Sequence, residues 1–266
     1  MSGKNVKRKI LICGYPKSGN TWLTRLTAEI VGCPVSGYWD HPNANEIGIE
    51  GQERVSSFEC YKAHHSYDAL METLQRIGNG QEKIIYIWRD PRDVVVSATH
   101  YFKPQLKPLD PRIFKLLRVF PGGKALYRKC FMRDQRLQKL MAEGLILGSS
   151  LNFWLQIPWH EHVRGYEGRR DVLHMSYESM LRDPLSCARE ICRFLGLKRS
   201  DCELEEAVRM QSFDSRKSAF EQEGNTRQTT FLRNGRAGAW ESELSEQNRH
   251  LIESKLSEPL RTLGYL

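Results

Sequence analysis

The sequence predicts an α/β fold in which helices flank a central parallel sheet. Short apolar runs rich in β-branched residues alternate along the chain with segments whose apolar residues recur at helical spacing. Strands that alternate with helices favour a parallel sheet covered on both faces. The first strand also enters its helix through a glycine-containing turn, an arrangement that builds an anion site. We expect one domain spanning residues 1–266.

Composition and charge restrict the class of protein. The chain is 40% hydrophobic and 27% charged, as in ordinary globular proteins, and its net charge of +8 predicts an anionic partner. That partner could be a nucleotide, a phosphorylated or sulfated ligand, a membrane surface or nucleic acid. Seven cysteines without C-x-x-C pairs predict reduced thiols, a cytoplasmic location and no zinc site. The apolar run after the basic N-terminus, about four residues, is too short for a signal peptide or a membrane anchor.

The first strand, turn and helix predict an anion site. Residues 10–13 are typical of a buried strand, and the turn over 14–19 contains two glycines. We expect Asn20 to cap the following helix, which should end near Gly32. Backbone N–H groups at a helix start attract an anion, and Lys17 adds a full positive charge. A phosphate- or sulfate-binding loop is therefore expected; the alternative is an ordinary turn with a surface lysine.

The remaining elements follow from periodicity and from capping residues. Asp90 and Pro91, for example, are typical of a helix start. Residues 213–240 show no clear period. The elements expected after the first helix are a surface loop over 35–54, a strand over 57–62, a helix over 67–77, a strand over 83–88, a helix over 91–102, a basic helical segment over 103–139, a helix over 151–166, a strand over 171–176, and helices over 183–196, 201–211 and 243–263.

The segment 103–139 contains eleven Lys and Arg residues and two acids. It could be a solvated basic subdomain, a docking face for an anionic acceptor, or a membrane contact, which its amphipathic character permits without requiring. We expect a helical insertion over 103–149 that forms a lid, because long insertions beside a site are usually lids or binding loops. The apolar residues expected to pack it on the rest of the fold are Leu106, Ile113, Leu116, Leu117, Val119, Phe120 and Leu126.

The order of residues in the first loop separates two kinds of phosphate site. A Walker A loop reads G-x-x-x-x-G-K-[ST], whereas here Lys17 precedes Gly19. The sequence Y-P-K-S-G-N-T-W closely resembles the loop with which cytosolic-type sulfotransferases bind the 5′-phosphosulfate of PAPS, the sulfuryl donor 3′-phosphoadenosine 5′-phosphosulfate. The resemblance implies a P-loop-like, PAPS-binding core. The residues it assigns to the phosphosulfate are Lys17, Ser18, Gly19, Asn20 and Thr21, with Trp22 stacked on adenine.

A second match is Lys62-Ala63-His64, which resembles the K-T-H segment whose histidine is the family's catalytic base. The resemblance implies that His64 is the base and that Lys62 and Lys17 are also catalytic. A histidine pKa near ~6.5 suits a base at neutral pH. Ala63 stands where the family has threonine, and a second histidine, His65, follows at once. A lone histidine at a strand end is ordinarily structural, but the matching lysine favours the catalytic interpretation.

The third match, Trp88 to Ser97, resembles the family segment in which an arginine and a serine eight residues later hold the 3′-phosphate. These residues correspond to Arg89 and Ser97. A loop after the carboxyl end of a strand is where open α/β sheets bind ligands, and a guanidinium fork suits a dianionic phosphate. The alternative for Arg89 is a surface ion pair with Asp93.

The fourth match, residues 231–240, resembles the R-K-G-x-x-G-D-W segment that closes over the 3′-phosphate. Asn234 replaces the family's lysine and Ala239 its aspartate, so one charge is lost, and Arg236 is a candidate to compensate for it. Smaller matches are S-Y-E, like the family's Y-E-D, and Q-S-F, like its adenine-contact T-S-F. The nucleotide-binding residues these matches imply are Tyr177, Ser212, Phe213, Phe231, Leu232, Arg233, Asn234 and Gly235.

The resemblance implies metal-independent transfer of a sulfuryl group from PAPS to a hydroxyl or amine of a small-molecule acceptor by in-line attack. The product nucleotide would be PAP, adenosine 3′,5′-bisphosphate, and the basic segment over 103–139 predicts a polar or anionic acceptor. Peripheral membrane contact is permitted. A P-loop-type kinase or ATPase would need magnesium and a Walker B aspartate, and the strand over 83–88 is followed by Arg89 and then Asp90. A basic nucleic-acid-binding protein would explain the charge but not four ordered motifs. The identity of the acceptor and the oligomeric state stay open.

Overall fold

The chain forms two compact units. The computed structural model describes residues 7–40, 49–103, 106, 108–148, 156–222, 224 and 235–266. The first unit comprises Met1–Arg89 and His162–Ala237, and the second comprises Asp90–Glu161 and Gly238–Leu266. The first unit contains the sheet, which confirms the predicted α/β class. The assignment of all 266 residues to one domain stays a prediction.

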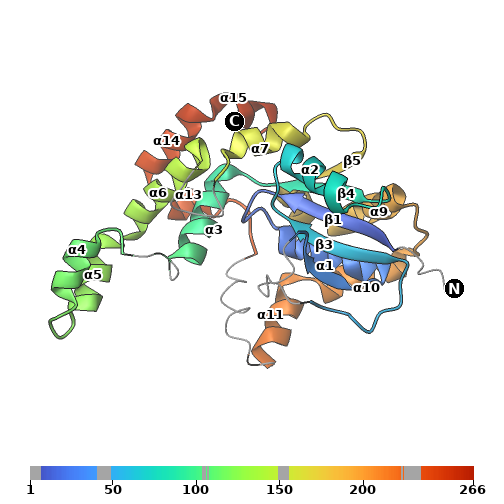
Figure 1. The fold of residues 1–266 in the computed structure, drawn as a ribbon, viewed down its shortest axis with the longest axis horizontal. Coiled ribbons are helices and arrows are strands. Elements are labelled where there is room, and N and C mark those ends of the chain that lie inside the picture. The colour runs from blue at the N-terminus through green and yellow to red at the C-terminus, as the bar shows by residue number, and fades with distance from the viewer. Residues whose placement is uncertain are drawn as a thin grey trace. The chain divides into compact units, whose positions relative to one another are not determined.

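The sheet has five parallel strands in the order β2-β3-β1-β4-β5. The strands are β1 (Arg8–Gly14), β2 (Val35–Tyr38), β3 (Phe58–Ala63), β4 (Lys83–Trp88) and β5 (Val172–Ser176). β1 lies at the centre (Figure 1). From β1 the chain passes to β2 at one edge of the sheet, whereas from β4 it passes to β5 at the opposite edge. Open α/β sheets bind ligands beyond the carboxyl ends of strands at such a switch point.

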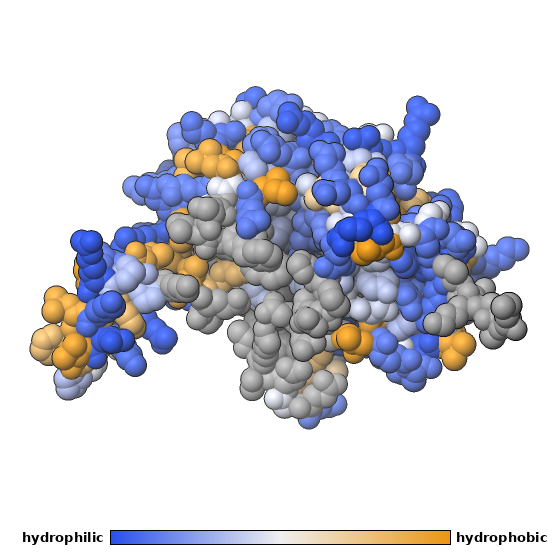
Figure 2. All heavy atoms as spheres, viewed as in Figure 1, coloured by the Kyte–Doolittle hydropathy of each residue, from blue (hydrophilic) through white to orange (hydrophobic). Residues whose placement is uncertain are grey.

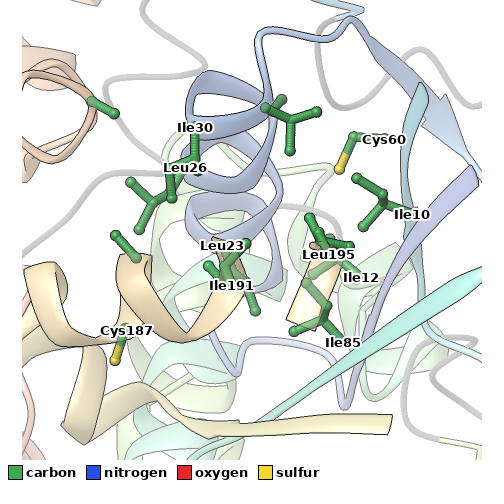
Figure 3. Packing of buried hydrophobic residues seen from close by; sticks show 14 of the residues in the cluster. Ile10, Ile12, Leu23, Leu26, Ile30, Cys60, Ile85, Cys187, Ile191 and Leu195 are labelled. Carbon is green, nitrogen blue, oxygen red and sulfur yellow. The ribbon is translucent and has the colours of Figure 1, made fainter. Parts of the chain in front are cut away.

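Alternating residues of β1 pack on opposite faces of the sheet, as expected of a strand buried on both sides. Ile10 and Ile12 face α1 (Asn20–Val31), whereas Leu11 and Cys13 belong to the core on the other face. Figure 3 shows the first core, in which side chains of β1, α1 and α9 turn toward one another. The helices on that face are α1, α8 (Tyr177–Arg182), α9 (Pro184–Leu195) and α10 (Asp201–Met210), and α2 (Tyr67–Ile77) covers the other face (Figure 1).

The register of the sheet aligns the ends of its strands. Cys13 lies opposite Ala63, Gly14 opposite Ile87, and Ile87 opposite Met175. The segments that leave β1, β3, β4 and β5 therefore begin at one edge of the sheet. Three of the sequence matches, and the tyrosine at the start of α8, follow directly from these ends.

The second unit is helical. Its α3 (Pro91–Phe102) begins as predicted, because the Asp90 side chain accepts a hydrogen bond from the backbone N–H of Arg92 and Pro91 occupies the first turn. Its other helices are α4 (Pro111–Leu117), α5 (Gly123–Phe131), α6 (Asp134–Leu147), α13 (Trp240–Glu243), α14 (Glu246–Lys255) and α15 (Ser257–Thr262), with the first residues of α7 (Trp159–Tyr166). Across the described ranges, the chain contains no helix with both the length and the apolar character needed to cross a bilayer.

Four sequence-based boundaries were wrong. The helix expected over 151–166 begins only at Trp159, since residues 156–158 are not helical. Residues 35–38 are a strand rather than part of a surface loop, and both Tyr38 and Trp39 are buried. β2 has four residues and includes Gly37 at φ 99°, so its sequence carried no readable alternation. The aperiodic segment begins with a helix, α11 (Phe213–Gln222). The single helix expected over 243–263 is divided, because Ser245 caps α14 and the helix ends at Lys255.

Candidate active site

The turn after β1 has the backbone of an anion-binding loop. Lys17 and Gly19 have positive φ values of 70° and 98°, and α1 begins directly after them. Glycine is required at position 19, because a Cβ atom there would lie 2.6 Å from Cδ2 of Tyr177. Gly19 is the N-cap of α1, so the prediction that Asn20 caps this helix was wrong.

The Asn20 side chain instead joins two strand ends. Its amide nitrogen donates to the Gly14 carbonyl at 3.0 Å and to the Ala63 carbonyl at 3.3 Å. The amide is thus engaged in tertiary contacts and is not used to cap its own helix. The anion loop after β1 is thereby fixed to the end of β3, where the predicted base follows.

Lys17 is a strained, half-buried cation in this loop. Burial, and secondarily the charge of Arg89, lower the pKa of the Lys17 ammonium to about 7. A bound dianion would favour the charged form and offset this cost. The loop, the start of α1 and Lys17 therefore suit an anionic group, and the binding of the phosphosulfate there stays a prediction.

Arg89 follows β4 at the same edge of the sheet. Its side chain is buried, its Nη2 donates to the Arg236 carbonyl at 2.9 Å, and its guanidinium carbon lies 4.2 Å from the centre of the Tyr177 ring. Tyr177 also packs edge-to-face on Trp22, with 5.8 Å between ring centroids. Three residues predicted to bind the nucleotide thus come together around one aromatic ring.

His64 is held in one tautomer by a backbone carbonyl. Its Nδ1 lies 2.8 Å from the Gly14 carbonyl oxygen, which can only accept, so Nδ1 carries the proton and Nε2 carries the lone pair. Burial, and then the charge of Lys62, lower the pKa of His64 well below 6.5. The value near 6.5 expected from the residue type alone was too high. At neutral pH the ring is therefore a neutral base.

Lys62 links three elements beneath the site. It is buried, and its Nζ donates to the Thr21 hydroxyl at 3.2 Å and to the Tyr38 hydroxyl at 3.1 Å. The Tyr38 ring lies 5.9 Å from the His64 ring. Lys62 thus positions α1 and β2 beside His64 and contributes a positive charge there; its catalytic role stays a prediction.

A buried aromatic cluster supports the backbone of both histidines, and the sequence did not reveal it. His162 Nε2 donates to the His64 carbonyl at 3.3 Å, while its Nδ1 accepts from the Tyr86 hydroxyl at 3.0 Å. The Tyr166 hydroxyl donates to the His65 carbonyl at 2.8 Å. Burial lowers the pKa of His162 to about 4, so it stays neutral in this role. The only feature of the sequence that could have indicated this cluster was His162, a histidine among apolar residues of a helix.

A second group of predicted residues meets at the start of α11. Ser212 accepts from the backbone N–H of Ser215, and Phe213 packs against the backbone of Gly235. A Cβ atom at position 235 would lie 2.3 Å from Cδ2 of Phe213, and Gly235 has a φ of 57°. The adenine-contact segment and Gly235 of the fourth match therefore lie together.

The comparison with protein families decides the class of this chain. Residues 7–261 match the family model described as the sulfotransferase domain. The chain belongs to the sulfotransferase family. It is therefore an enzyme of the PAPS-dependent sulfotransferase class, as the four ordered motifs predicted.

Individual relatives match this sulfotransferase along nearly its whole length. Cytosolic sulfotransferase 17 of Arabidopsis thaliana is 24% identical over 96% of this chain and 75% of its own. Luciferin sulfotransferase of Photinus pyralis is 29% identical over 90% of this chain and 68% of its own. The crystal structure of mouse sulfotransferase SULT7A1 complexed with PAP superimposes with a TM-score of 0.67, at 22% identity, over 96% of this chain and 85% of that one. The fold is therefore that of the family.

Some predicted residues of the sulfotransferase site are not brought together here. Ser97 lies on α3 in the second unit, so its pairing with Arg89 stays a prediction. Residues Phe231, Leu232, Arg233 and Asn234 lie outside the described residues. Among the residues that the structure describes, no group of three or more His, Cys, Asp and Glu side chains could hold a metal ion.

Proposed function

We propose that this sulfotransferase moves a sulfuryl group from PAPS to a hydroxyl or amine of a small-molecule acceptor, with His64 as general base. The observation that carries the proposal is the His64 ring, neutral and with its lone pair on Nε2, at the same sheet edge as the Lys17 loop. An acceptor proton would be taken up at Nε2, and such a base typically contributes about 10²–10⁴-fold to the rate.

The chain's own cations suit the donor. Lys17, Ser18, Gly19, Asn20 and Thr21 would hold the 5′-phosphosulfate at the start of α1, and Arg89 would hold the 3′-phosphate, with Ser97 and residues 231–235 as further predicted partners. The donor supplies the sulfuryl group and a nucleotide leaving group. Lys17 would neutralise the negative charge that develops on the departing nucleotide, because stabilisation of developing charge by a preorganised group is usually the largest single contribution to lowering such a barrier. Tyr177 and Trp22 offer an aromatic wall for adenine.

The acceptor is proposed only as a class. Luciferin sulfotransferase, a relative, is named for a small molecule, which favours a small-molecule acceptor here too. Segments 35–54, 103–150 and 213–230 are predicted to shape its pocket. All seven cysteines are unpaired thiols, in keeping with the cytoplasmic location that we propose.

The kinase alternative loses its Walker B candidate. Asp90 is buried, and both of its carboxylate oxygens accept hydrogen bonds from the Arg92 guanidinium, at 2.7–3.1 Å. A fourth hydrogen bond, from the backbone N–H of Arg92 to the Asp90 side chain, caps α3. A carboxylate held in this way is a structural ion pair and a helix cap, and is poorly suited to bind magnesium.

The direct test is incubation with sulfur-labelled PAPS, without metal, and a panel of phenols, steroid alcohols and arylamines. We expect label to transfer to at least one acceptor and the His64→Ala variant to lose that transfer. Release of labelled phosphate from Mg·ATP, with no sulfuryl transfer to any acceptor, would contradict the proposal and favour the kinase.

A further inference from the structure

Four large apolar side chains are exposed on the hairpin formed by α4 and α5. They are Leu116, Val119, Phe120 and Leu126, with 66%, 75%, 61% and 50% of their surface exposed, and we call them the hairpin tip. Figure 2, drawn in the same view as Figure 1, shows hydrophobic and hydrophilic side chains together over α4 and α5. Contiguous exposed apolar side chains mark interaction sites more often than chance exposure does.

The hairpin has a separate apolar face that forms its own core. Ile113, Phe114 and Leu117 pack against buried Tyr127, and the Phe114 ring meets the Tyr127 ring edge-to-face at 5.1 Å. The Tyr127 hydroxyl also accepts from the backbone N–H of Asp110 at 2.8 Å. The two helices are therefore held together without the tip. The expectation that the tip residues also pack on the rest of the fold was wrong.

The turn between the helices keeps the tip exposed. Phe120 N–H donates to the Leu117 carbonyl at 3.1 Å, and Gly123 N–H donates to the Phe120 carbonyl at 3.0 Å. Gly122 has a φ of 76°, and a Cβ atom at Gly123 would lie 1.7 Å from the Leu117 carbonyl oxygen. Two consecutive glycines and two backbone bonds thus fix a tight turn that projects Val119 and Phe120 outward.

The tip is surrounded by positive charge. Residues 111–133 contain seven Lys and Arg residues and no Asp or Glu. All seven side chains are exposed: Arg112, Lys115, Arg118, Lys124, Arg128, Lys129 and Arg133. An apolar tip ringed by cations is complementary to a surface that carries negative charge over an apolar interior.

We propose that the α4–α5 hairpin docks this enzyme on an anionic lipid bilayer. The tip enters the boundary between headgroups and acyl chains, while the seven cations contact lipid phosphates and carboxylates. Amphipathic elements of this composition bind at that boundary, and each basic residue near an anionic membrane adds about fivefold in affinity.

A nucleic acid fits the hairpin less well. Nucleic-acid surfaces bind through cations, polar groups and stacked aromatic rings. Leu116, Val119 and Leu126 can neither stack on bases nor donate hydrogen bonds, and their exposure would stay unexplained. A bilayer accounts for both the charges and the aliphatic side chains.

The first test is flotation of the full chain with vesicles of phosphatidylcholine alone, or of phosphatidylcholine mixed with phosphatidylserine, at several salt concentrations. We expect binding to the anionic vesicles only, weakening with salt. The Val119→Ser, Phe120→Ser double variant should lose at least tenfold in affinity. The matched control, Val55→Ser with Leu147→Ser, removes two apolar side chains elsewhere that are at least as exposed as Val119 and Phe120 and should bind normally. Absence of binding by the wild type, or equal losses in both double variants, would overturn the proposal.

The second test separates a bilayer from nucleic acid. A Phe120→Cys substitution, in a Cys130→Ser, Cys202→Ser background that removes the two exposed native thiols, provides a site for an environment-sensitive dye. Anionic vesicles should shift its emission to the blue, as expected on entering an apolar phase. Neutralising Lys115, Arg118 and Arg128 to Gln should abolish the shift, whereas neutralising exposed Arg193, Lys198 and Lys255 should not. No shift with vesicles, together with RNA or DNA binding that the first trio of substitutions abolishes, would replace the bilayer with nucleic acid.

Discussion

At the scale of single residues, one backbone carbonyl organises the site. The Gly14 oxygen accepts from both His64 and Asn20, so it fixes the tautomer of the proposed base and ties the anion loop to β3. The same small region lowers the pKa values of Lys17 and His64, because burial disfavours both charged forms and neighbouring cations add to the effect. Perturbed groups gathered beyond the strand ends are typical of a catalytic site.

The first prediction at this scale assigns the base to His64 rather than His65. Adjacent residues at a strand end point to opposite sides, and His64 is the histidine whose ring donates to the Gly14 carbonyl at the strand ends. His64→Ala should lower kcat by about 10²-fold or more while PAP affinity is kept. The acid limb of the wild-type pH profile should lie below pH 6.5, since the base is already neutral above it. A crippled His65→Ala variant beside a near-normal His64→Ala variant would refute the assignment.

The second prediction uses the lowered pKa of Lys17, about 7 in the free protein. PAP should bind the protonated lysine and raise its pKa, so binding takes up a proton. From about pH 7 to 9 the Kd should therefore rise, by up to about tenfold per pH unit for one linked proton. Calorimetry in buffers of different ionisation enthalpy measures both quantities. Lys17→Arg stays charged and should flatten the profile; an equally steep rise in this variant would show that another group titrates.

At the scale of elements, the strand–turn–helix of β1 and α1 depends on what packs behind it. Gly19 has a φ of 98°, and the Tyr177 ring at the start of α8 occupies the space a side chain would need. The same ring contacts the Arg89 guanidinium and the Trp22 ring, so the turn and the residues predicted to bind the nucleotide pack against one side chain. A change in the turn should therefore affect both stability and donor binding.

Gly19→Ala tests this coupling. Positive φ and contact with the Tyr177 ring together should destabilise the fold by about 1–3 kcal/mol and weaken PAP binding at least tenfold. Gly32→Ala is the matched control, since Gly32 closes the same helix at φ 69° but a Cβ atom there would come no nearer than 3.8 Å to a neighbouring side chain. This control should cost about 1 kcal/mol for backbone strain alone and leave PAP affinity unchanged. Urea unfolding and calorimetry give the two quantities; equal PAP affinities in both variants would contradict the coupling.

At the scale of the whole molecule, the net positive charge and the buried, unpaired cysteines fit an enzyme of the sulfotransferase class, whose donor is anionic. The excess of eight positive charges is concentrated where anions are expected, in the Lys17 loop and on the α4–α5 hairpin. Five of the seven cysteines are buried, and burial raises the pKa of Cys13 to about 12. These buried thiols should be unreactive at neutral pH, because the thiolate is the nucleophilic form.

Ligand-dependent stability tests the donor for the whole chain. PAP should raise the melting temperature in the presence of a chelator, whereas Mg·ATP should do so much less because it lacks a 3′-phosphate. A ligand that binds only the native state adds RT ln(1 + [L]/Kd), about 2.7 kcal/mol at a hundredfold excess over Kd. Lys17→Ala should reduce the shift with PAP. Protection by Mg·ATP equal to that by PAP would favour a kinase.

The sequence by itself determined the features that are encoded locally. The strands over 10–13 and 83–88, the cap at Asp90, and the order of residues around Lys17 are short patterns, and each predicted its element or its family correctly. Local patterns failed where an element was too short or too irregular, as in β2 and α11.

Only the tertiary structure decided the chemical state of the site. The His64 tautomer depends on a carbonyl 50 residues away, and the backbone of His64 depends on His162, 98 residues away. No periodicity or spacing records such pairs, because they form only when the register of the sheet aligns its strand ends. The exposure of the hairpin tip was equally unreadable, since Leu117 and Leu116 are the same residue type and differ only in which face of α4 the neighbouring helix covers.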